Sequence, residues 1–412
     1  MKINNVSDFK IELPEYIKSL IDLLNSKGYE AYAVGGCVRD CVMGRVPNDF
    51  DMTTNATPDE MLAVFSGYKV IETGLKHGTL TVISEDIPVE ITTYRVDGEY
   101  HDSRHPDRVY FTRNLKDDVS RRDFTVNAMA YNDKTGIVDF YGGMNDINKK
   151  LIMAVGDADK RFKEDALRII RALRFASVLC FDIEETTASA ARKNAELLKN
   201  ISAERINVEL KKLLQGKNAI KILKEYSDIL AYVSKEMFSF CTEKLKNLSD
   251  APDDVNVFFA FLLVGATERE VNDALSRLKF SNAERKEITE LLLLEQKDIP
   301  KNKIEMKLFI SETDIELISK YLALLSALGK EISSAEKYYS EIRDNKECVY
   351  ISDLKVNGND LSKTGISKGK EIGQVLKFLL FAVINGEIEN EKEALLELAK
   401  NTFLTAPANK EN

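Results

Sequence analysis

The stretch AYAVGGCVRDCVMGRVPNDFDMTT, residues 31–54, decides the fold of the N-terminal part of the chain. Its first four residues are apolar and predict a short buried strand. Gly35 and Gly36 follow, and they let the backbone turn sharply and approach a ligand closely. A helix is expected from about Cys37, with Arg39 in its first turn. Free N–H groups, a positive dipole end and a guanidinium together are typical of a phosphate site.

Two carboxylates, Asp49 and Asp51, come after this helix. If the segment is a strand, both point to one face while Phe50 points into the core. Neighbouring carboxylates repel each other unless a cation lies between them, and oxygen ligands of this type suit Mg²⁺ together with substrate phosphates. A simple turn and a solvated loop are the alternatives for the Gly-Gly and Asp-x-Asp motifs taken singly. Their combination predicts a metal-assisted nucleotide site.

A third carboxylate, Glu90, lies between Val89 and Ile91 in a predicted strand over residues 88–95. Because side chains alternate along a strand, Glu90 points to the face opposite its two apolar neighbours. An exposed strand edge is the alternative. Beside Asp49 and Asp51, Glu90 is expected to complete a three-carboxylate cluster that holds a second metal ion and polarises an attacking hydroxyl.

Residues 120–127, SRRDFTVN, are predicted to open a helix with a capping serine. Arg121 and Arg122 at a helix start are electrostatically unfavourable unless an anion offsets the dipole, and a triphosphate is such an anion. Asp123 belongs to the same cluster. A surface charge cluster is the alternative.

A single helix is predicted over residues 164–175, with an apolar stripe on one side. The stripe consists of Ala166, Ile169, Ile170 and Leu173. Arg168, Arg171 and Arg174 recur on another side, and Asp165 is a surface neighbour of Arg168. An ordinary surface ion pair is one interpretation. The other is a protein template, because an acceptor beside donors matches the pairing edge of cytosine or adenine and rejects uracil and guanine.

Composition limits the class of protein. The chain has 412 residues, 44% hydrophobic and 30% charged, which is typical of a soluble multidomain protein. A net charge of −9 argues against indiscriminate binding to long nucleic acid. No apolar run is long enough for a membrane span and no signal peptide is visible. Five cysteines predict reduced thiols and a cytoplasmic setting, and three histidines are too few for a histidine-built metal centre.

The predicted fold class is α+β, with an N-terminal mixed-sheet head followed by an all-helical remainder. Four parts are expected: a catalytic head over residues 1–155, a neck with the nucleotide-selecting helix over 156–215, a body over 216–345 and a tail over 346–412. A mobile polar loop containing His101 and Asp102 is predicted after the third carboxylate. In the tail, Gly369 and Lys370 at a helix start form either an RNA phosphate contact or a simple turn.

These motifs resemble those of the polymerase-β-like nucleotidyltransferases, and most closely the class II family of bacterial tRNA nucleotidyltransferases and poly(A) polymerases. The resemblance covers all four parts. It implies Mg²⁺ binding by Asp49 and Asp51 with support from Glu90, and triphosphate contacts from Gly36, Arg39 and Arg122. Gly35 and Asp123 are placed in the same nucleotide site. The resemblance also implies base selection by Asp165 and Arg168, with Arg171 and Arg174 close by.

The implied activity is template-independent addition of CCA to the 3′ end of tRNA from CTP and ATP, with release of pyrophosphate. Within the family, an enzyme that adds only the terminal A remains an alternative. A poly(A) polymerase fits less well, because the chain is acidic and lacks a basic extension. A catalytically silent tRNA-binding protein is the alternative outside enzymes, although the three carboxylates are all present. No protein partner is implied.

Overall fold

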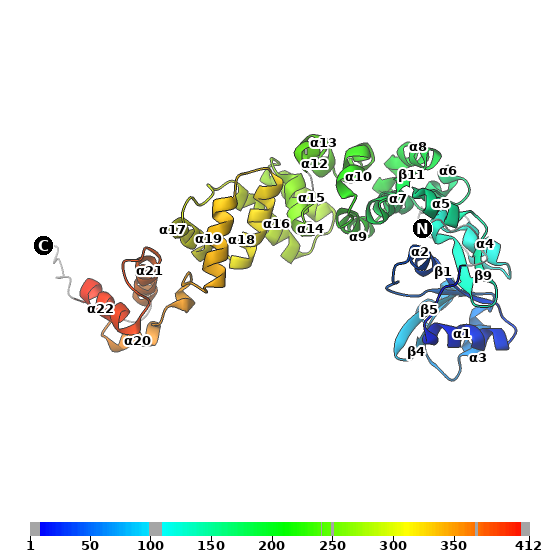
Figure 1. Ribbon diagram of the computed structural model, residues 1–412, viewed down its shortest axis with the longest axis horizontal. Coiled ribbons are helices and arrows are strands. Elements are labelled where there is room, and N and C mark those ends of the chain that lie inside the picture. The colour runs from blue at the N-terminus through cyan, green and yellow to red at the C-terminus, as the bar shows by residue number, and fades with distance from the viewer. Residues whose placement is uncertain (1–8, 99–108, 240, 249–250, 367–369, 405–412) are drawn as a thin grey trace. The chain divides into compact units, whose positions relative to one another are not determined.

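The computed structural model describes residues 9–98, 109–239, 241–248, 251–366 and 370–404. The predicted His101-Asp102 loop and Gly369 lie outside the described residues. The chain forms two compact units, Met1–Lys246 with Thr267–Phe280 and Asn247–Ala266 with Ser281–Asn412 (Figure 1). The first unit contains the predicted head and neck whole and ends within the predicted body. The four-part division itself stays a prediction.

A seven-stranded mixed sheet forms the N-terminal part of the first unit (Figure 1). In spatial order its strands are β3 (Lys69–Ile71), β4 (Thr79–Ser84), β5 (Ile87–Thr93), β2 (Met52–Thr54), β1 (Ala31–Val34), β8 (Met129–Asn132) and β9 (Gly136–Asp139). β2 and β5 are parallel, and the other neighbours are antiparallel. Two small ladders pair β6 (Arg95–Asp97) with β7 (Val109–Phe111) and β10 (Leu151–Ile152) with β11 (Asp182–Ile183).

The sheet forms because its strands carry apolar residues at the positions that face other elements. All four residues of β1 are buried, so this central strand is covered on both faces. Tyr32 and Val34 pack in a cluster with Tyr94, Leu115 and Val119. In β4, buried and half-buried residues alternate, which is the pattern of a strand with one face more open.

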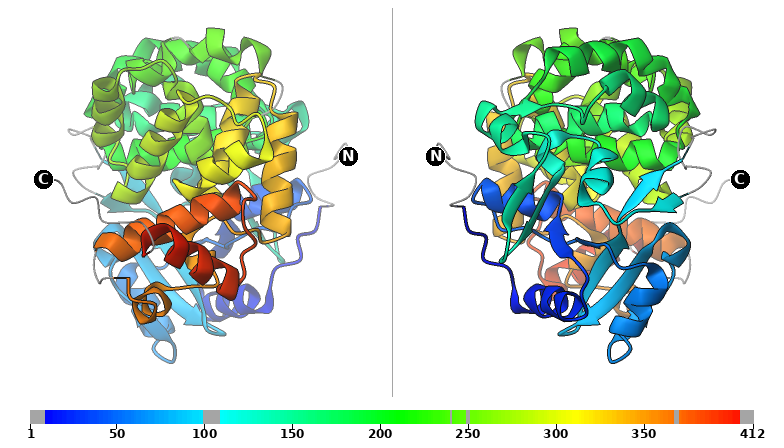
Figure 2. Two further views of the ribbon diagram at one scale, coloured as in Figure 1. Left: turned by 90° about the vertical axis from the view of Figure 1, so that its left-hand side faces the viewer. Right: turned by 90° about the vertical axis from the view of Figure 1, so that its right-hand side faces the viewer.

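Short helices surround this sheet in the first unit. They are α1 (Glu15–Ser26), α2 (Gly36–Val42), α3 (Pro58–Val64), α4 (Leu115–Ser120) and α5 (Gly143–Lys149). α1, in dark blue in Figure 2, buries Ile17, Leu20 and Leu24. α3 begins with a capping box in which Thr57 accepts from the backbone of Glu60 and Glu60 accepts from that of Thr57, as its sequence predicts.

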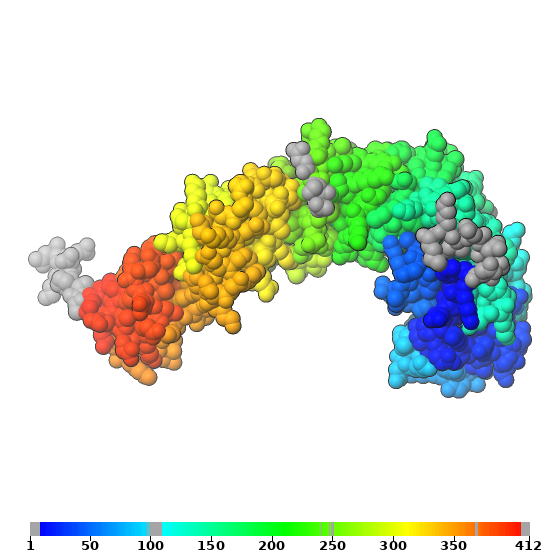
Figure 3. Space-filling view, viewed as in Figure 1, coloured from blue at the N-terminus to red at the C-terminus, as the bar shows by residue number. Residues whose placement is uncertain are grey.

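The remainder of the first unit, coloured from teal to green in Figure 3, is almost wholly helical by its backbone hydrogen bonds. Its helices are α6 (Ala158–Glu164), α7 (Leu167–Leu179), α8 (Glu185–Asn194), α9 (Ala203–Leu214), α10 (Ala219–Glu225), α11 (Ser227–Leu230), α12 (Lys235–Phe238), α13 (Cys241–Lys244) and α15 (Glu268–Arg277). α7 packs extensively against α9. The predicted apolar stripe of α7 is confirmed, because Ile169, Ile170 and Leu173 are fully buried.

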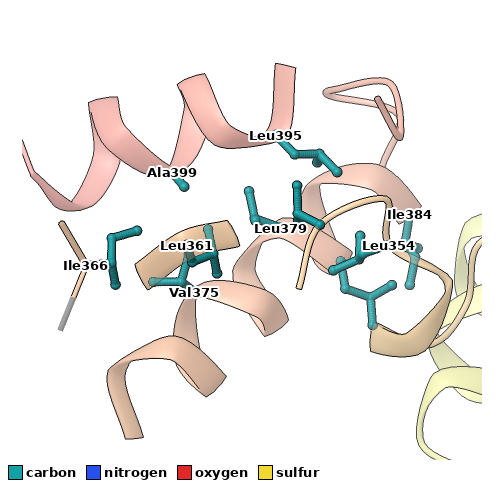
Figure 4. Packing of buried hydrophobic residues seen from close by; sticks show 10 residues of the cluster. Leu354, Leu361, Ile366, Val375, Leu379, Ile384, Leu395 and Ala399 are labelled. Carbon is teal, nitrogen blue, oxygen red and sulfur yellow. The ribbon is translucent and has the colours of Figure 1, made fainter. Parts of the chain in front are cut away.

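The second unit consists of helices. They are α14 (Val255–Leu263), α16 (Asn282–Glu295), α17 (Lys303–Ser311), α18 (Ile315–Ala327), α19 (Ser333–Asp344), α20 (Gly358–Lys363), α21 (Lys370–Ile384) and α22 (Lys392–Phe403). α20, α21 and α22 share an apolar cluster around Leu361, Leu379 and Leu395 (Figure 4). The predicted α+β class is confirmed. Across the described ranges, no helix combines the length and apolar character needed to cross a membrane.

The predicted helix start at Ser120 is wrong. Ser120 is the last residue of α4, and its hydroxyl donates back to the carbonyl of Asp117. Arg121 and Arg122 therefore follow a helix C-terminus, where the dipole favours cations. The signal was misread because a serine beside charged residues occurs at both ends of helices, and the apolar Leu115 and Val119 that mark α4 precede it.

The predicted continuous helix over residues 164–175 is also wrong. α6 ends at Glu164, Asp165 adopts an extended backbone with φ of −143°, and α7 begins at Leu167. The Asp165 carboxylate accepts from the backbone N–H of Leu167 at 3.0 Å. An aspartate that binds the backbone two residues ahead competes with a continuing helix, which explains the break.

Candidate active site

Asp49 and Asp51 lie just before β2, not on it, so the prediction that a strand carries both is wrong. The antiparallel register places Ala33 opposite Met52, and the N–H of Val34 donates to the carbonyl of Asp51 at 2.9 Å. Beyond that bond the partner chain turns into α2, so no strand remains for Asp49 to pair with. Phe50, predicted to lie in the core, is half-buried and lines a surface cavity of about 310 Å³.

Glu90 lies beside Asp51. β2 and β5 are parallel with Met52 opposite Ile91, so continuing this register by one residue places Asp51 next to Glu90. Glu90 is exposed while Val89 and Ile91 are buried, which confirms the predicted alternation. Neighbours in register on adjacent strands point to the same face. The two carboxylates therefore share one face of the sheet at its centre.

Repulsion among these carboxylates is visible in the protonation of Asp51. Desolvation, together with the charges of Asp49 and Glu90, raises its pKa to about 6, and Arg122 opposes this shift. A cation would relieve this repulsion, so the donor set fits a divalent metal ion. Within the described ranges, no three His, Cys, Asp or Glu side chains form a complete metal site by themselves.

The glycine turn lies against Arg122. Gly35 has φ of 85° and ψ of −127°, a conformation essentially restricted to glycine. A Cβ at Gly35 would lie 2.8 Å from Nη1 of Arg122. Burial lowers the pKa of Arg122, and Asp118, 3.8 Å away, opposes that shift. Arg122 thus brings positive charge directly to the Gly-Gly turn.

Gly35→Ala is expected to destabilise the protein and to displace the Arg122 guanidinium. The backbone strain costs roughly 1–3 kcal/mol. The added methyl group would push the end of the Arg122 side chain away, which should raise the KM for a nucleotide. Thermal unfolding and steady-state kinetics measure the two effects.

Gly44→Ala is the matched control, because Gly44 also has positive φ, of 70°, but no neighbour within 4 Å of an added Cβ. It should reproduce part of the lost stability and leave the nucleotide KM unchanged. An equal rise in KM for both variants would remove Arg122 from the explanation.

Arg39 is buried and held on three sides. Its Nη1 donates to Oδ1 of Asn127 at 2.7 Å, and its Nε and Nη2 donate to Asp40. Its guanidinium carbon also lies 5.3 Å from the centroid of the Phe175 ring. These contacts fix Arg39 at the first helical turn after Gly36, where the predicted phosphate site lies.

Asp123 connects the sheet to α7. Its carboxylate accepts from the Phe124 N–H and from Nδ2 of Asn127, and both Nε and Nη2 of Arg171 donate to Oδ2 at 2.9 and 2.6 Å. Burial alone would raise the pKa of Asp123, but Arg171 and the hydrogen bonds lower it to about 2. Asp123 therefore stays ionised and holds Arg171 in place.

Asp123→Asn is expected to cost roughly 3 kcal/mol of unfolding free energy at pH 7, because it removes the carboxylate partner of the largely buried Arg171. The folded pKa lies below the unfolded value, so the stabilisation is complete above about pH 4 and is lost as the pH falls towards 2. The difference in unfolding free energy between Asp123→Asn and the natural protein should therefore shrink by about 2 kcal/mol between pH 4 and pH 2. Urea unfolding at pH 7, 4 and 2.5 measures this, with the exposed Asp86→Asn as control; parallel pH curves would contradict it.

Asp165 and Arg168 do not pair through their side chains. Asp165 binds Nη2 of Arg205 at 2.7 Å, while Nη1 of Arg168 donates to Glu164 at 2.7 Å. Arg168 is 9% exposed, and its Nη2 donates to the carbonyl of Arg121. The surface ion pair expected between them is thus absent from the structure. Each group is instead oriented by a neighbour.

Several residues of this network were missed in the sequence. Asn127, Glu164, Phe175, Arg205 and Glu209 each contact a candidate site residue. Glu164 precedes Asp165 directly, so its position was a usable signal. Arg205 and Glu209 lie on or beside the buried face of α9, and nothing local distinguishes them from ordinary helix residues.

Comparisons with known proteins agree with this geometry. The family model described as Poly A polymerase head domain matches residues 31–153, and a tRNA nucleotidyltransferase domain 2 model matches residues 253–399. A third model, for an RNA and SrmB-binding site of polymerase A, matches residues 180–237. The glycine turn, the carboxylates and the sheet thus define a nucleotidyltransferase.

The relatives identify the family. A CCA-adding enzyme of Staphylococcus saprophyticus is 37% identical over 395 residues, covering 94% of this chain and 98% of its own. One of Ligilactobacillus salivarius is 35% identical, covering 97% and 98%. The crystal structure of the Bacillus stearothermophilus CCA-adding enzyme in complex with CTP superposes with a TM-score of 0.76 at 31% identity, covering 95% and 98%. The chain belongs to the family of CCA-adding enzymes, whose chemistry depends on a metal ion.

Proposed function

We propose that this protein adds CCA, without a nucleic-acid template, to the 3′ end of tRNA, using CTP and ATP and releasing pyrophosphate. The proposal depends mainly on one observation: the carboxylates, the glycine turn and α7 all lie in the first unit and are linked by close contacts. Asp51 lies beside Glu90, Arg122 lies against the Gly35 turn, and α7 is tied to the same region through Asp123. The similarity to CCA-adding enzymes over nearly the whole chain supports the same assignment.

In the proposed reaction, the tRNA 3′-hydroxyl attacks the α-phosphate of the nucleotide in line with the leaving pyrophosphate. Asp49 and Asp51 would hold Mg²⁺, with Glu90 supporting them, and a bound metal ion would supply Lewis acidity for the phosphoryl transfer. Arg39 and Arg122 lie where they can neutralise the triphosphate. The protein therefore acts mainly by positioning the reactants and by offsetting charge.

The base would be selected by Asp165 and Arg168. Arg168 has acceptors for Nη1 in Glu164 and the carbonyl of Arg161, and for Nη2 in the carbonyl of Arg121. Its Nε has no partner among the described residues, so a donor remains for a base. Asp165 keeps free acceptor capacity beside the Arg205 bond. This donor and acceptor pair suits cytosine and adenine, and the held side chains restrict other choices.

We further propose that the four sequence-defined parts act as head, neck, body and tail, with the tail serving tRNA binding, and that the protein works in the cytoplasm. All five cysteines are free thiols, which fits a reducing compartment.

Incorporation of labelled nucleotides tests the function. Transcripts of tRNA ending before CCA, after the first C and after the second C are incubated with each of the four nucleoside triphosphates and Mg²⁺. Two C residues and then one A on the shortest transcript are expected, and chelation of the metal should stop the reaction. Addition of A alone, to the CC end only, would identify an A-adding enzyme. Long A runs on unrelated RNA would identify a poly(A) polymerase, and no addition would leave a binding protein.

A further inference from the structure

Three guanidinium groups surround one aromatic ring in the first unit. The guanidinium carbons of Arg39, Arg171 and Arg174 lie 5.3, 5.3 and 3.7 Å from the centroid of Phe175. An aromatic face attracts cations, but it does not cancel the repulsion among three of them. Such a cluster therefore needs carboxylates to hold it together in the absence of a ligand.

Each of these arginines has its own carboxylate. Asp40 binds Arg39 and Asp123 binds Arg171. For Arg174, Glu209 is the one carboxylate partner among the described residues, with Oε2 at 2.8 Å from Nε. Glu209 also lies 3.5 Å from Nη1 of Arg171. Glu209 is 7% exposed and comes from α9, which packs against α7.

Arg171 and Arg174 differ in how many of their N–H donors already have a partner. Arg171 uses Nε and Nη2 on Asp123 and turns Nη1 to Glu209. Arg174 forms an ion pair with Glu209 through Nε, without the geometry of a hydrogen bond, and none of its N–H groups has a hydrogen-bond partner among the described residues. Burial, with repulsion from Arg171 and Arg39, lowers the pKa of Arg174 to about 10, and Glu209 opposes this. Arg171 is thus a structural link, while Arg174 keeps donors for an anion.

We propose that Glu209 is a positioning residue for nucleotide binding that acts through Arg174. Its carboxylate offsets the charge of Arg174 through the ion pair at Nε, so that the guanidinium stays in place and offers Nη1 and Nη2 to an anionic group of CTP or ATP. Without Glu209, Arg174 would be repelled by Arg39 and Arg171 and would leave this position. The proposal rests on the proposed function, since Arg174 belongs to the nucleotide site assigned there.

Glu209→Gln tests the proposal, because it keeps the shape of the side chain and removes the charge. The dissociation constant and the KM for CTP and ATP should rise on the order of tenfold, as for the loss of the ion-pair partner of a buried charge. The kcat should change by less than about threefold and the KM for tRNA should stay the same, because chemistry and tRNA contacts are untouched. Glu209→Asp, which keeps the charge, should retain most of the nucleotide affinity.

Glu204→Gln is the matched control, since Glu204 is exposed on the same helix and its loss changes the net charge equally. A further control adds Glu209→Gln to Arg174→Gln. If Glu209 acts through Arg174, the double variant should bind nucleotide no more weakly than Arg174→Gln alone.

Three results would overturn the proposal. The first is an equal change in nucleotide affinity in Glu209→Gln and Glu204→Gln, and the second is a double variant that binds nucleotide more weakly than Arg174→Gln alone. The third is loss of folding in Glu209→Gln, which would make Glu209 a structural residue. Nucleotide binding is measured without tRNA by titration calorimetry. If the natural protein adds no nucleotide to tRNA, the proposed function is refuted. If Glu209→Gln nevertheless weakens CTP binding, the inference about Glu209 still holds.

Discussion

Asp51→Ala is expected to reduce nucleotide addition by on the order of a thousandfold or more, because loss of a metal carboxylate removes several kcal/mol of transition-state stabilisation. Asp49→Ala should have the same effect. Binding of tRNA should remain largely unchanged, since neither carboxylate is expected to contact it. Single-turnover incorporation of CTP measures the first quantity, and filter binding of labelled tRNA measures the second.

Stability separates this result from misfolding. The folded pKa of Asp51 is raised to about 6 from an ordinary value of 3.8, so the folded protein holds its proton more tightly than the unfolded chain. Between these values stability falls as the pH rises, and at pH 7 the ionised Asp51 is a net cost to the metal-free fold. Asp51→Ala should therefore unfold at the same or a higher temperature than the natural protein without metal.

The exposed Glu72→Ala is a suitable control, because it removes one carboxylate from the same part of the chain outside the site. It should leave addition, tRNA binding and stability unchanged. Retained activity in Asp51→Ala or Asp49→Ala would refute the metal assignment. A lower unfolding temperature would refute the repulsion among Asp49, Asp51 and Glu90.

Arg168→Ala is expected to lower the preference for CTP over UTP by on the order of a hundredfold. A site built to hydrogen-bond one base edge rejects others because their groups stay unpaired, and removal of the donor removes this penalty. The ratio of kcat/KM for CTP and UTP, measured in competition on transcripts ending before CCA, reports the change. The overall rate should fall as well, since Arg168 also holds Glu164.

Two controls isolate the base edge. Lys163→Ala removes a cation from the exposed side of α6, where its ion pair with Asp159 is at the surface, and should leave selectivity intact. Glu164→Gln keeps Arg168 but weakens its support, so it should relax selectivity less than Arg168→Ala does. Unchanged discrimination in Arg168→Ala would place the protein template elsewhere.

Much of the site could be predicted because its signals are local. The turn at Gly35 and Gly36, the exposed position of Glu90 between two buried neighbours, and the capping box at Thr57 each depend on a few consecutive residues. Backbone geometry and side-chain alternation act over that same range. The predicted strands and the apolar stripe of α7 follow for the same reason.

Errors arose where a local signal had two meanings. Ser120 can begin or end a helix, and only the packing of Leu115 and Val119 on the sheet side decides that it ends one. Asp49 and Asp51 have strand spacing, but pairing stops where β1 turns at Gly35 and no partner is left. Tertiary context, and not propensity, settled both.

The sequence by itself determined the class of this protein: a glycine turn, three carboxylates and an arginine-rich segment define a nucleotidyltransferase. Only the tertiary structure decided which charges meet. Arg171 binds Asp123 across 48 positions, and Arg205 binds Asp165 across 40. Local patterns report backbone geometry and burial, whereas the partner of a buried charge depends on which helices pack together. For this reason the contact of Glu209 with Arg174 could not be predicted from the sequence and follows only from the packing of α9 against α7.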